Sequence, residues 1–181
     1  MALAGVLSKL LVGRAFTTEK GRIVTFGKIS WILFPSRAMA LVLQDIGKRS
    51  GEDYLYKIGY DAGKDFAKEI SNMLGLKIKA GKMVQQVIMS LTEFTGFGTI
   101  RIIKWSVEKN GHHLVKIHVK NNPVIEHSKR LYGKKSMGCA FFRGVFSAHL
   151  EFETYAKNVN FVEKHCQCKK GGGYCLWETK W

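Results

Sequence analysis

The most regular pattern of apolar and polar positions lies between Glu52 and Leu74. Apolar residues recur there every three or four positions, the spacing of one buried helix face, at Leu55, Ile58, Ala62, Phe66 and Ile70. Gly59 and Gly63 lie one turn apart in this segment, although glycine costs a helix about 1 kcal/mol relative to alanine. The pattern therefore predicts a long helix whose backbone lies close to a neighbouring element.

Three other segments have the apolar spacing of helices. The first begins at Pro35, which is tolerated in a first turn, and weakens at Gly47. The second covers residues 80–94, and the third covers residues 136–152. Small residues recur every four positions in the third helix and predict close packing there. They are Ala140, Gly144 and Ala148.

The two remaining non-strand segments differ in character. Met1–Val12 is apolar but too short to span a bilayer, and it lacks the basic start and cleavage site of a signal peptide. We expect residues 1–20 to form a helical extension that covers the core or a partner subunit. Residues 121–135 are polar and contain Pro123, so the sequence predicts that this segment starts as a loop.

A β-hairpin is predicted from Thr99–Val107 and His113–Val119, joined through Lys109-Asn110-Gly111. A three-residue loop with Gly111 in the left-handed conformation pairs Trp105 with Val115 and Ile103 with Ile117. This register keeps the apolar residues on one face, whereas a two-residue loop would mix them with lysine. The opposite face should meet water and carries Lys104, Ser106, Lys116 and His118.

Three further segments have the composition of strands. Arg22–Phe26 is short and β-branched, between Gly21 and Gly27. Near the C-terminus we expect strands at Asn158–Cys166 and Tyr174–Thr179. With the hairpin, these make four long strands in the second half of the chain.

The composition is that of one domain. The chain has 181 residues, of which 46% are hydrophobic, and only two prolines, with no Ser/Pro-rich linker. We find no catalytic Ser/His/Asp pattern, phosphate-binding glycine loop or dinucleotide-binding fingerprint. The sequence therefore favours a single cytoplasmic domain without enzymatic activity.

The chain is strongly basic, with a formal net charge of +15 and a pI of about 9.8. Such a charge attracts nucleic acids and anionic membranes non-specifically. The lysines are, however, scattered over every segment, and no motif for reading DNA is present. Nucleic-acid binding is therefore not indicated by any motif.

The cysteines supply the main candidate chemistry. Cys166, Cys168 and Cys175 lie close together near the C-terminus, and glycines 171–173 bend the chain between them. Glu163 precedes Cys166 by three residues, and Cys139 lies in the first turn of a predicted helix, where a thiolate is stabilised. Thiolates with one carboxylate suit Zn²⁺, whereas a disulfide scaffold is usually richer in cysteine. Redox-active or inert buried thiols are the alternatives.

A regular strand would point Glu163 and Cys166 to opposite faces. Both can bind one ion only if the strand bends or bulges near Lys164 and His165. His165 is a further possible ligand, although we expect it to be an exposed strand residue.

The ordered motifs resemble the 4-vinyl-reductase domain family. The resemblance is carried by Cys139 before A-F-F-R-G, by E-K-H-C at residues 163–166, and by C-L-W at residues 175–177 after the glycines. The runs at residues 21–27, 31–36 and 56–63 are similar in style, so the resemblance covers nearly the whole chain. It implies one domain over residues 1–181, with helices packed on a four-stranded antiparallel sheet, an α+β fold like that of small TRAPP vesicle-tethering subunits.

This resemblance also implies a site and a function. In similar sensory domains of phenol-responsive transcription regulators, the matching positions bind zinc beside a buried pocket for small aromatics. The ligands here would be Cys139, Glu163, Cys166 and Cys175. The spacing between the last two is one residue longer than in the family, which leaves Cys168 as an alternative third ligand.

The function expected on this basis is zinc-stabilised binding or sensing of a small apolar or aromatic ligand by a homodimer. Phe142, Phe146 and Trp177 lie near the proposed ligands and are the candidate pocket residues. Two alternatives stay open at this point: a thiol-based redox switch in a regulatory complex, and an accessory or reductase role in tetrapyrrole metabolism.

Overall fold

The computed structural model describes residues 16–19, 22–25, 29–31, 34–74, 93, 96–109 and 111–181. The predicted helices at Met1–Val12 and 80–94 lie outside these residues, except for Glu93, which is helical. Residues 16–19, at the end of the expected helical extension 1–20, form strand β1 (Phe16–Glu19).

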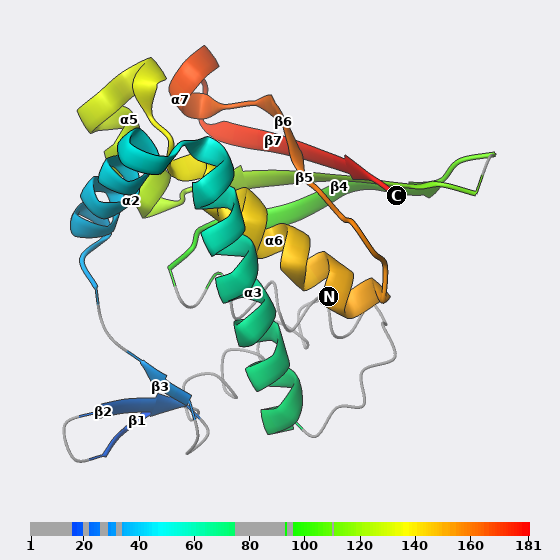
Figure 1. Cartoon of the computed structure of the whole chain (residues 1–181), viewed down its shortest axis with the longest axis horizontal. Coiled ribbons are helices and arrows are strands. Elements are labelled where there is room, and N and C mark those ends of the chain that lie inside the picture. Colours follow the sequence, from blue (N-terminus) through cyan, green and yellow to red (C-terminus); the bar gives the residue numbers. More distant parts are fainter. Residues whose placement is uncertain are drawn as a thin grey trace.

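The fold is α+β, with a four-stranded antiparallel sheet and several helices (Figure 1). The sheet has the order β4-β5-β7-β6, and its strands are β4 (Thr99–Val107), β5 (His113–Lys120), β7 (Tyr174–Lys180) and β6 (Val162–His165). A small second sheet contains β1, β2 (Arg22–Thr25) and β3 (Ile29–Trp31). The main helices are α2 (Ser36–Ser50), α3 (Glu52–Leu74), α5 (Pro123–Tyr132) and α6 (Gly138–Thr154). The sequence thus predicted the fold class correctly.

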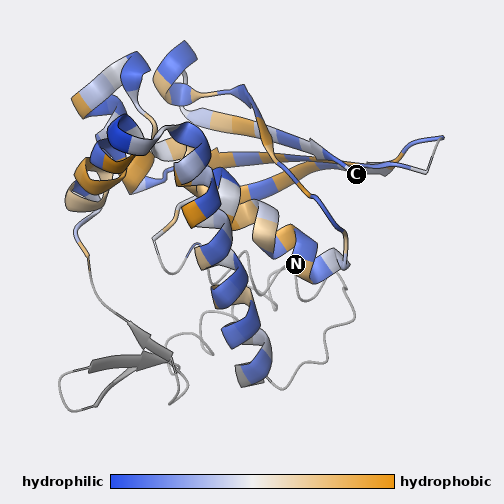
Figure 2. Cartoon of the chain, viewed as in Figure 1, coloured by the Kyte–Doolittle hydropathy of each residue, from blue (hydrophilic) through white to orange (hydrophobic). Residues whose placement is uncertain are grey.

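Helix α6 lies between α3 and the sheet and forms the centre of the core. Toward the sheet, the Phe146 ring lies 5.8 Å from the Trp177 ring on β7. The long helix α3 covers α6 from the other side and turns its polar residues to solvent (Figure 2). Within the described residues, no helix is long and apolar enough to cross a membrane.

Glycines allow α3 and α6 to touch through their backbones, as predicted from the spacing of Gly59 and Gly63. A Cβ atom on Gly63 would lie 2.6 Å from the carbonyl oxygen of Val145, and one on Gly59 would overlap the carbonyl of Phe141. Gly144 on α6 faces α3 in the same way. These small residues therefore pack one helix against the other inside the chain, which leaves them unavailable for a contact between subunits.

The hairpin has the predicted loop but a different register at one end. Gly111 has a φ of 80°, and Trp105 pairs with Val115, as expected. Ile117, however, pairs with Ile102, and Ile103 occupies a bulge with its side chain 48% exposed. The predicted pairing of Ile103 with Ile117 is therefore wrong. The bulge keeps Ile102 on the core side.

Residues 123–132 form helix α5, so the predicted loop is restricted to the residues before it. The side chain of Asn122 caps this helix by accepting a hydrogen bond of 2.9 Å from the Ile125 amide. Pro123 occupies the first helical position, where its missing N–H is not needed. A proline that suggested a loop thus marks a helix start.

Candidate metal centre

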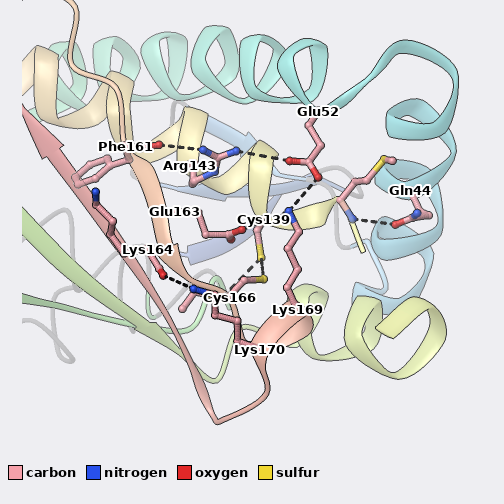
Figure 3. Close-up of polar contacts among 12 residues, drawn as sticks. Gln44, Glu52, Cys139, Arg143, Phe161, Glu163, Lys164, Cys166, Lys169 and Lys170 are labelled. Atoms are coloured by element: carbon pink, nitrogen blue, oxygen red, sulfur yellow. Dashed lines mark hydrogen bonds and ion pairs between the residues drawn. The ribbon is translucent and has the colours of Figure 1, made fainter. Parts of the chain in front are cut away.

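Four side chains from three elements meet at one end of the sheet. Cys139 is the second residue of α6, Glu163 lies in β6, Cys166 directly follows β6, and Cys175 lies in β7. One ligand atom from each lies within 4.8 Å of all the others. The three cysteines are buried, and Figure 3 shows Cys139, Glu163 and Cys166 converging beneath α6. The structure thus brings together the four residues expected from the sequence.

The sulfur–sulfur distances fit a tetrahedral metal site. The Cys139 Sγ atom lies 3.5 Å from the Cys166 Sγ and 3.7 Å from the Cys175 Sγ. Two thiolates bound at about 2.3 Å to one tetrahedral zinc ion are separated by roughly 3.8 Å. A disulfide would need about 2.05 Å, and all four cysteines of the chain are free.

The bulge needed to aim Glu163 and Cys166 at the same point is present. In the β6–β7 ladder Glu163 pairs with Trp177 and His165 pairs with Leu176, so one residue is skipped. Glu163 therefore faces the core on the side of Trp177, and the chain turns inward at Cys166. This register shift meets the condition set by the sequence, that the strand bend or bulge near Lys164 and His165 if both residues are to bind one ion.

Cys168 lies outside the four-residue set. It belongs to the short helix α7 (Gln167–Lys170) and is buried, and its Sγ donates to the carbonyl oxygen of Ile125 at 3.7 Å. Between the two alternative third positions, the geometry thus places Cys166 with Cys139, Glu163 and Cys175.

The electrostatics of the cluster favour a cation. Hydrogen bonds with Cys166, Cys168 and Cys175 raise the pKa of Cys139, whereas hydrogen bonds with Cys139, Cys168 and Cys175 lower the pKa of Cys166. Burial and the neighbouring Cys166 raise the pKa of Glu163. One oxygen of this carboxylate, Oε1, has no hydrogen-bond partner among the described residues. A divalent cation would satisfy this oxygen and stabilise the thiolates together.

Two basic residues that the sequence did not single out, Lys169 and Arg143, partly offset the rise in the pKa of Glu163 through their positive charge. Lys169 on α7 lies 3.5 Å from Glu163 and 3.2 Å from Glu52 on α3. Arg143 on α6 donates to the Phe161 carbonyl at 3.2 Å and lies 4.0 Å from Glu52 (Figure 3). The only feature of the sequence that could have indicated these contacts is the position of Lys169, which lies three residues after Cys166.

The three candidate pocket residues lie together on the inner side of α6 and β7. Phe142, Phe146 and Trp177 are buried, and Phe142 also meets Phe97 with ring centroids 5.6 Å apart. The indole N–H of Trp177 has no acceptor among the described residues. These rings form an apolar wall next to the cysteine cluster. The indole N–H of Trp177 is a hydrogen-bond donor in this wall that is not used by the described residues.

Further along the same face of α6 are two buried ionisable residues that sequence reasoning missed. His149 stacks on Phe66 of α3 at 5.7 Å, and burial lowers its pKa to about 4. Glu153, one turn later, is 6% exposed, and burial raises its pKa to about 7. At neutral pH, His149 is therefore uncharged and Glu153 is partly protonated.

No protein-family model matches the chain, and no curated protein matches its sequence. Among solved structures, the phenol-responsive sensory domain of the transcription activator PoxR with phenol matches with a TM-score of 0.71. The match covers 99% of this chain and 90% of that one at 14% identity. The chain has the fold of this sensory domain. At such an identity the similarity demonstrates the fold alone.

The carboxyl group of Glu153 provides a pH-dependent test of the core. Its pKa of about 7 in the folded chain exceeds the ordinary 4.5, so the folded state binds more protons between these values. Stability should therefore fall as the pH rises from 4.5 to 7. Glu153→Gln should stabilise the protein on the order of 2 kcal/mol at pH 8 and have little effect near pH 4.5. Urea unfolding at both pH values measures the change in the free energy of unfolding, and Glu69→Gln, at an exposed position, is the control. An equal change for Glu153→Gln at pH 4.5 and pH 8 would contradict the raised pKa of Glu153.

Proposed function

We propose that this protein is a zinc-stabilised domain that binds a small apolar or aromatic molecule, with a role in sensing. The observation that carries the proposal is the convergence of Cys139, Glu163, Cys166 and Cys175 within 4.8 Å. Three thiolates and one carboxylate form a complete tetrahedral set for zinc.

The proposed zinc has a structural role. A tetrahedron filled by four protein ligands leaves no open position for an activated water molecule. The four residues join the start of α6 to β6 and β7, which are distant in sequence. Binding there would add directly to the stability of the fold, because the unfolded chain has no preformed site.

The small-molecule part of the proposal is supported by the fold and by the aromatic wall. The similar domain of PoxR responds to phenol. In this chain, Phe142, Phe146 and Trp177 provide apolar ring surface beside the cysteine cluster, and the free indole N–H offers one polar contact. Apolar sites with few polar groups are typical of small-molecule binding.

Shortening one ring of this wall should separate ligand binding from metal binding. We expect Phe146→Leu to weaken phenol binding about tenfold, through lost ring contact of about 1.4 kcal/mol, and to keep one zinc per chain. The matched variant Phe161→Leu, also a buried phenylalanine, should keep its phenol affinity within about twofold. Isothermal calorimetry with parallel metal analysis measures both. Unchanged phenol binding by Phe146→Leu would contradict the assignment of the pocket.

We further propose that the protein is a homodimer. Helix α2 exposes Leu41 and Val42, and Phe34 lies exposed just before it. Burying these side chains against a second copy would remove apolar surface from water. Light scattering should give twice the chain mass of 20.4 kDa, and Leu41→Lys with Val42→Lys should give the monomer. A wild-type monomer at high concentration would contradict this arrangement.

A further inference from the structure

The outer face of the four-stranded sheet has a different character from the inner face. In β5, Val115, Ile117 and Val119 are buried on the side of α6. The alternate residues Lys116 and His118 point the other way and are only half-buried. In the described part of the chain, α3 and α6 both lie on the inner side (Figure 1). Neither of these two helices therefore covers the outer face.

The strand register gathers basic residues on this outer face from all four strands. Arg101 pairs with His118, Lys104 pairs with Lys116, and Lys120 pairs with Tyr174. Together the outer sides of the strands carry six basic residues, namely Arg101, Lys104, Lys116, Lys120, Lys164 and Lys180, and a single acidic one, Glu178. Lysines that look scattered along the sequence thus share one surface.

Ion pairs among the described residues neutralise only part of this positive charge. Glu178 lies 2.6 Å from Lys116 and 3.4 Å from Lys164, and Lys180 pairs with Glu108. Among the described residues, the other three make no ion pair; they are Arg101, Lys104 and Lys120.

The charge is also unevenly distributed over the molecule. Helix α3, on the other side of α6, has three lysines but five acidic residues, namely Glu52, Asp53, Asp61, Asp65 and Glu69. The net charge of +15 is therefore not a uniform property of the surface. The sheet face is one of the places where the positive charge is concentrated.

Aromatic rings lie among these cations. The Tyr174 ring on β7 is 4.6 Å from the His118 ring on β5 and 4.7 Å from the His165 ring after the β6 bulge. The Lys120 ammonium lies 6.0 Å from the centre of the Tyr174 ring. Rings provide surfaces for base stacking, and neighbouring cations contact phosphates, which is how proteins bind single strands without a sequence motif.

We propose that the outer face of the β4-β5-β7-β6 sheet binds single-stranded nucleic acid. Arg101, Lys104 and Lys120 contact the phosphates, and the rings of Tyr174, His118 and His165 contact the bases. A duplex would present its phosphates but not its stacked bases, so the rings favour a single strand. This surface lies on the opposite side of the sheet from the cysteine cluster, so the inference is independent of zinc and small-molecule binding.

The test compares two variants of equal charge. The sheet variant combines Arg101→Gln, Lys104→Gln and Lys120→Gln. The control, the α3 variant, combines three substitutions at exposed lysines of α3, namely Lys57→Gln, Lys64→Gln and Lys68→Gln. Fluorescence anisotropy with labelled 12-nucleotide oligo(dT) and oligo(U), over a series of salt concentrations, gives the affinity and its salt dependence. RNA and DNA strands are measured separately because both have the chemistry required.

We expect the sheet variant to lose at least tenfold in affinity at 100 mM salt and its salt slope to decrease by about 2, since each lost phosphate contact removes about 0.7. The α3 variant should bind within about twofold of wild type with the same slope. Tyr174→Leu should weaken binding about fivefold or more with little change in slope, because stacking is not ionic.

Three results would overturn the proposal. The first is the absence of single-strand binding by the wild type at 100 mM salt. The second is an equal loss in the two charge-matched variants, which would show attraction to net charge alone. The third is binding of duplex DNA or phosphatidylserine vesicles that matches single-strand binding and is unaffected by Tyr174→Leu. Circular dichroism and zinc content of each variant confirm that the fold is retained.

Discussion

Cys175→Ser is expected to lose bound zinc and to unfold at least about 10 °C below the parent protein. Cys175 is fully buried in β7, and its thiol lies 3.7 Å from that of Cys139. Structural zinc sites contribute apparent binding free energies of about 10–16 kcal/mol in small domains, and a loss of only about 5 kcal/mol lowers the melting temperature of a chain of this size by roughly 10–20 °C. Thermal unfolding followed by circular dichroism, with elemental analysis of the same samples, measures both effects.

Cys168→Ser provides the matched control, because it makes the same exchange at a buried thiol outside the four-residue set. It should retain one zinc per chain and melt within about 5 °C of the parent, since the site itself is intact. Wild-type protein treated with a strong chelator should behave like Cys175→Ser. Equal behaviour of the two serine variants would contradict the ligand assignment.

Gly144→Ala should destabilise the protein by about 3 kcal/mol or more, although alanine favours an isolated helix by about 1 kcal/mol. The added Cβ would lie 2.6 Å from the Tyr60 amide nitrogen and overlap the Tyr56 carbonyl. Backbone atoms cannot rotate away, so α3 and α6 would have to separate along their whole contact. Urea unfolding monitored by tryptophan fluorescence measures the loss.

The control for this substitution is Gly173→Ala. No heavy atom of the described residues lies within 4 Å of the Cβ position at Gly173, and the backbone of Gly173 is not in the left-handed region. Its free energy of unfolding should change by no more than about 0.5 kcal/mol. A Gly144→Ala protein as stable as Gly173→Ala would show that the two helices can part without cost.

The clustering of three cysteines with Glu163 could be predicted from sequence because most of its signals are local. Glu163 and Cys166 are three residues apart, Cys175 follows a glycine turn, and Cys139 opens a helix with a clear pattern. The choice between Cys166 and Cys168 could not be made in the same way. This choice depends on where β6 ends and α7 begins, and the bulge in β6 determines that boundary.

Other features depend on contacts that no local pattern encodes. Ile102 and Ile103 are identical in type, so hydrophobicity alone cannot say which one occupies the bulge. Lys169 and His149 acquire their surroundings from α3, which is distant in sequence. The basic outer face appears only once the strands are in register. By contrast, the close approach at Gly59 and Gly63 was predictable, because glycine within a helix has a cost that packing must offset.

The most direct test of the central claim is zinc-edge X-ray absorption of the purified full chain, combined with elemental analysis. The site formed by Cys139, Glu163, Cys166 and Cys175 predicts one zinc per chain with three sulfur neighbours at about 2.3 Å and one oxygen at about 2.0–2.2 Å. In Glu163→Gln the three sulfur neighbours should persist while the metal binds more weakly. Protein that contains no zinc after expression in zinc-supplemented medium, or zinc with fewer than three sulfur neighbours, would contradict the account.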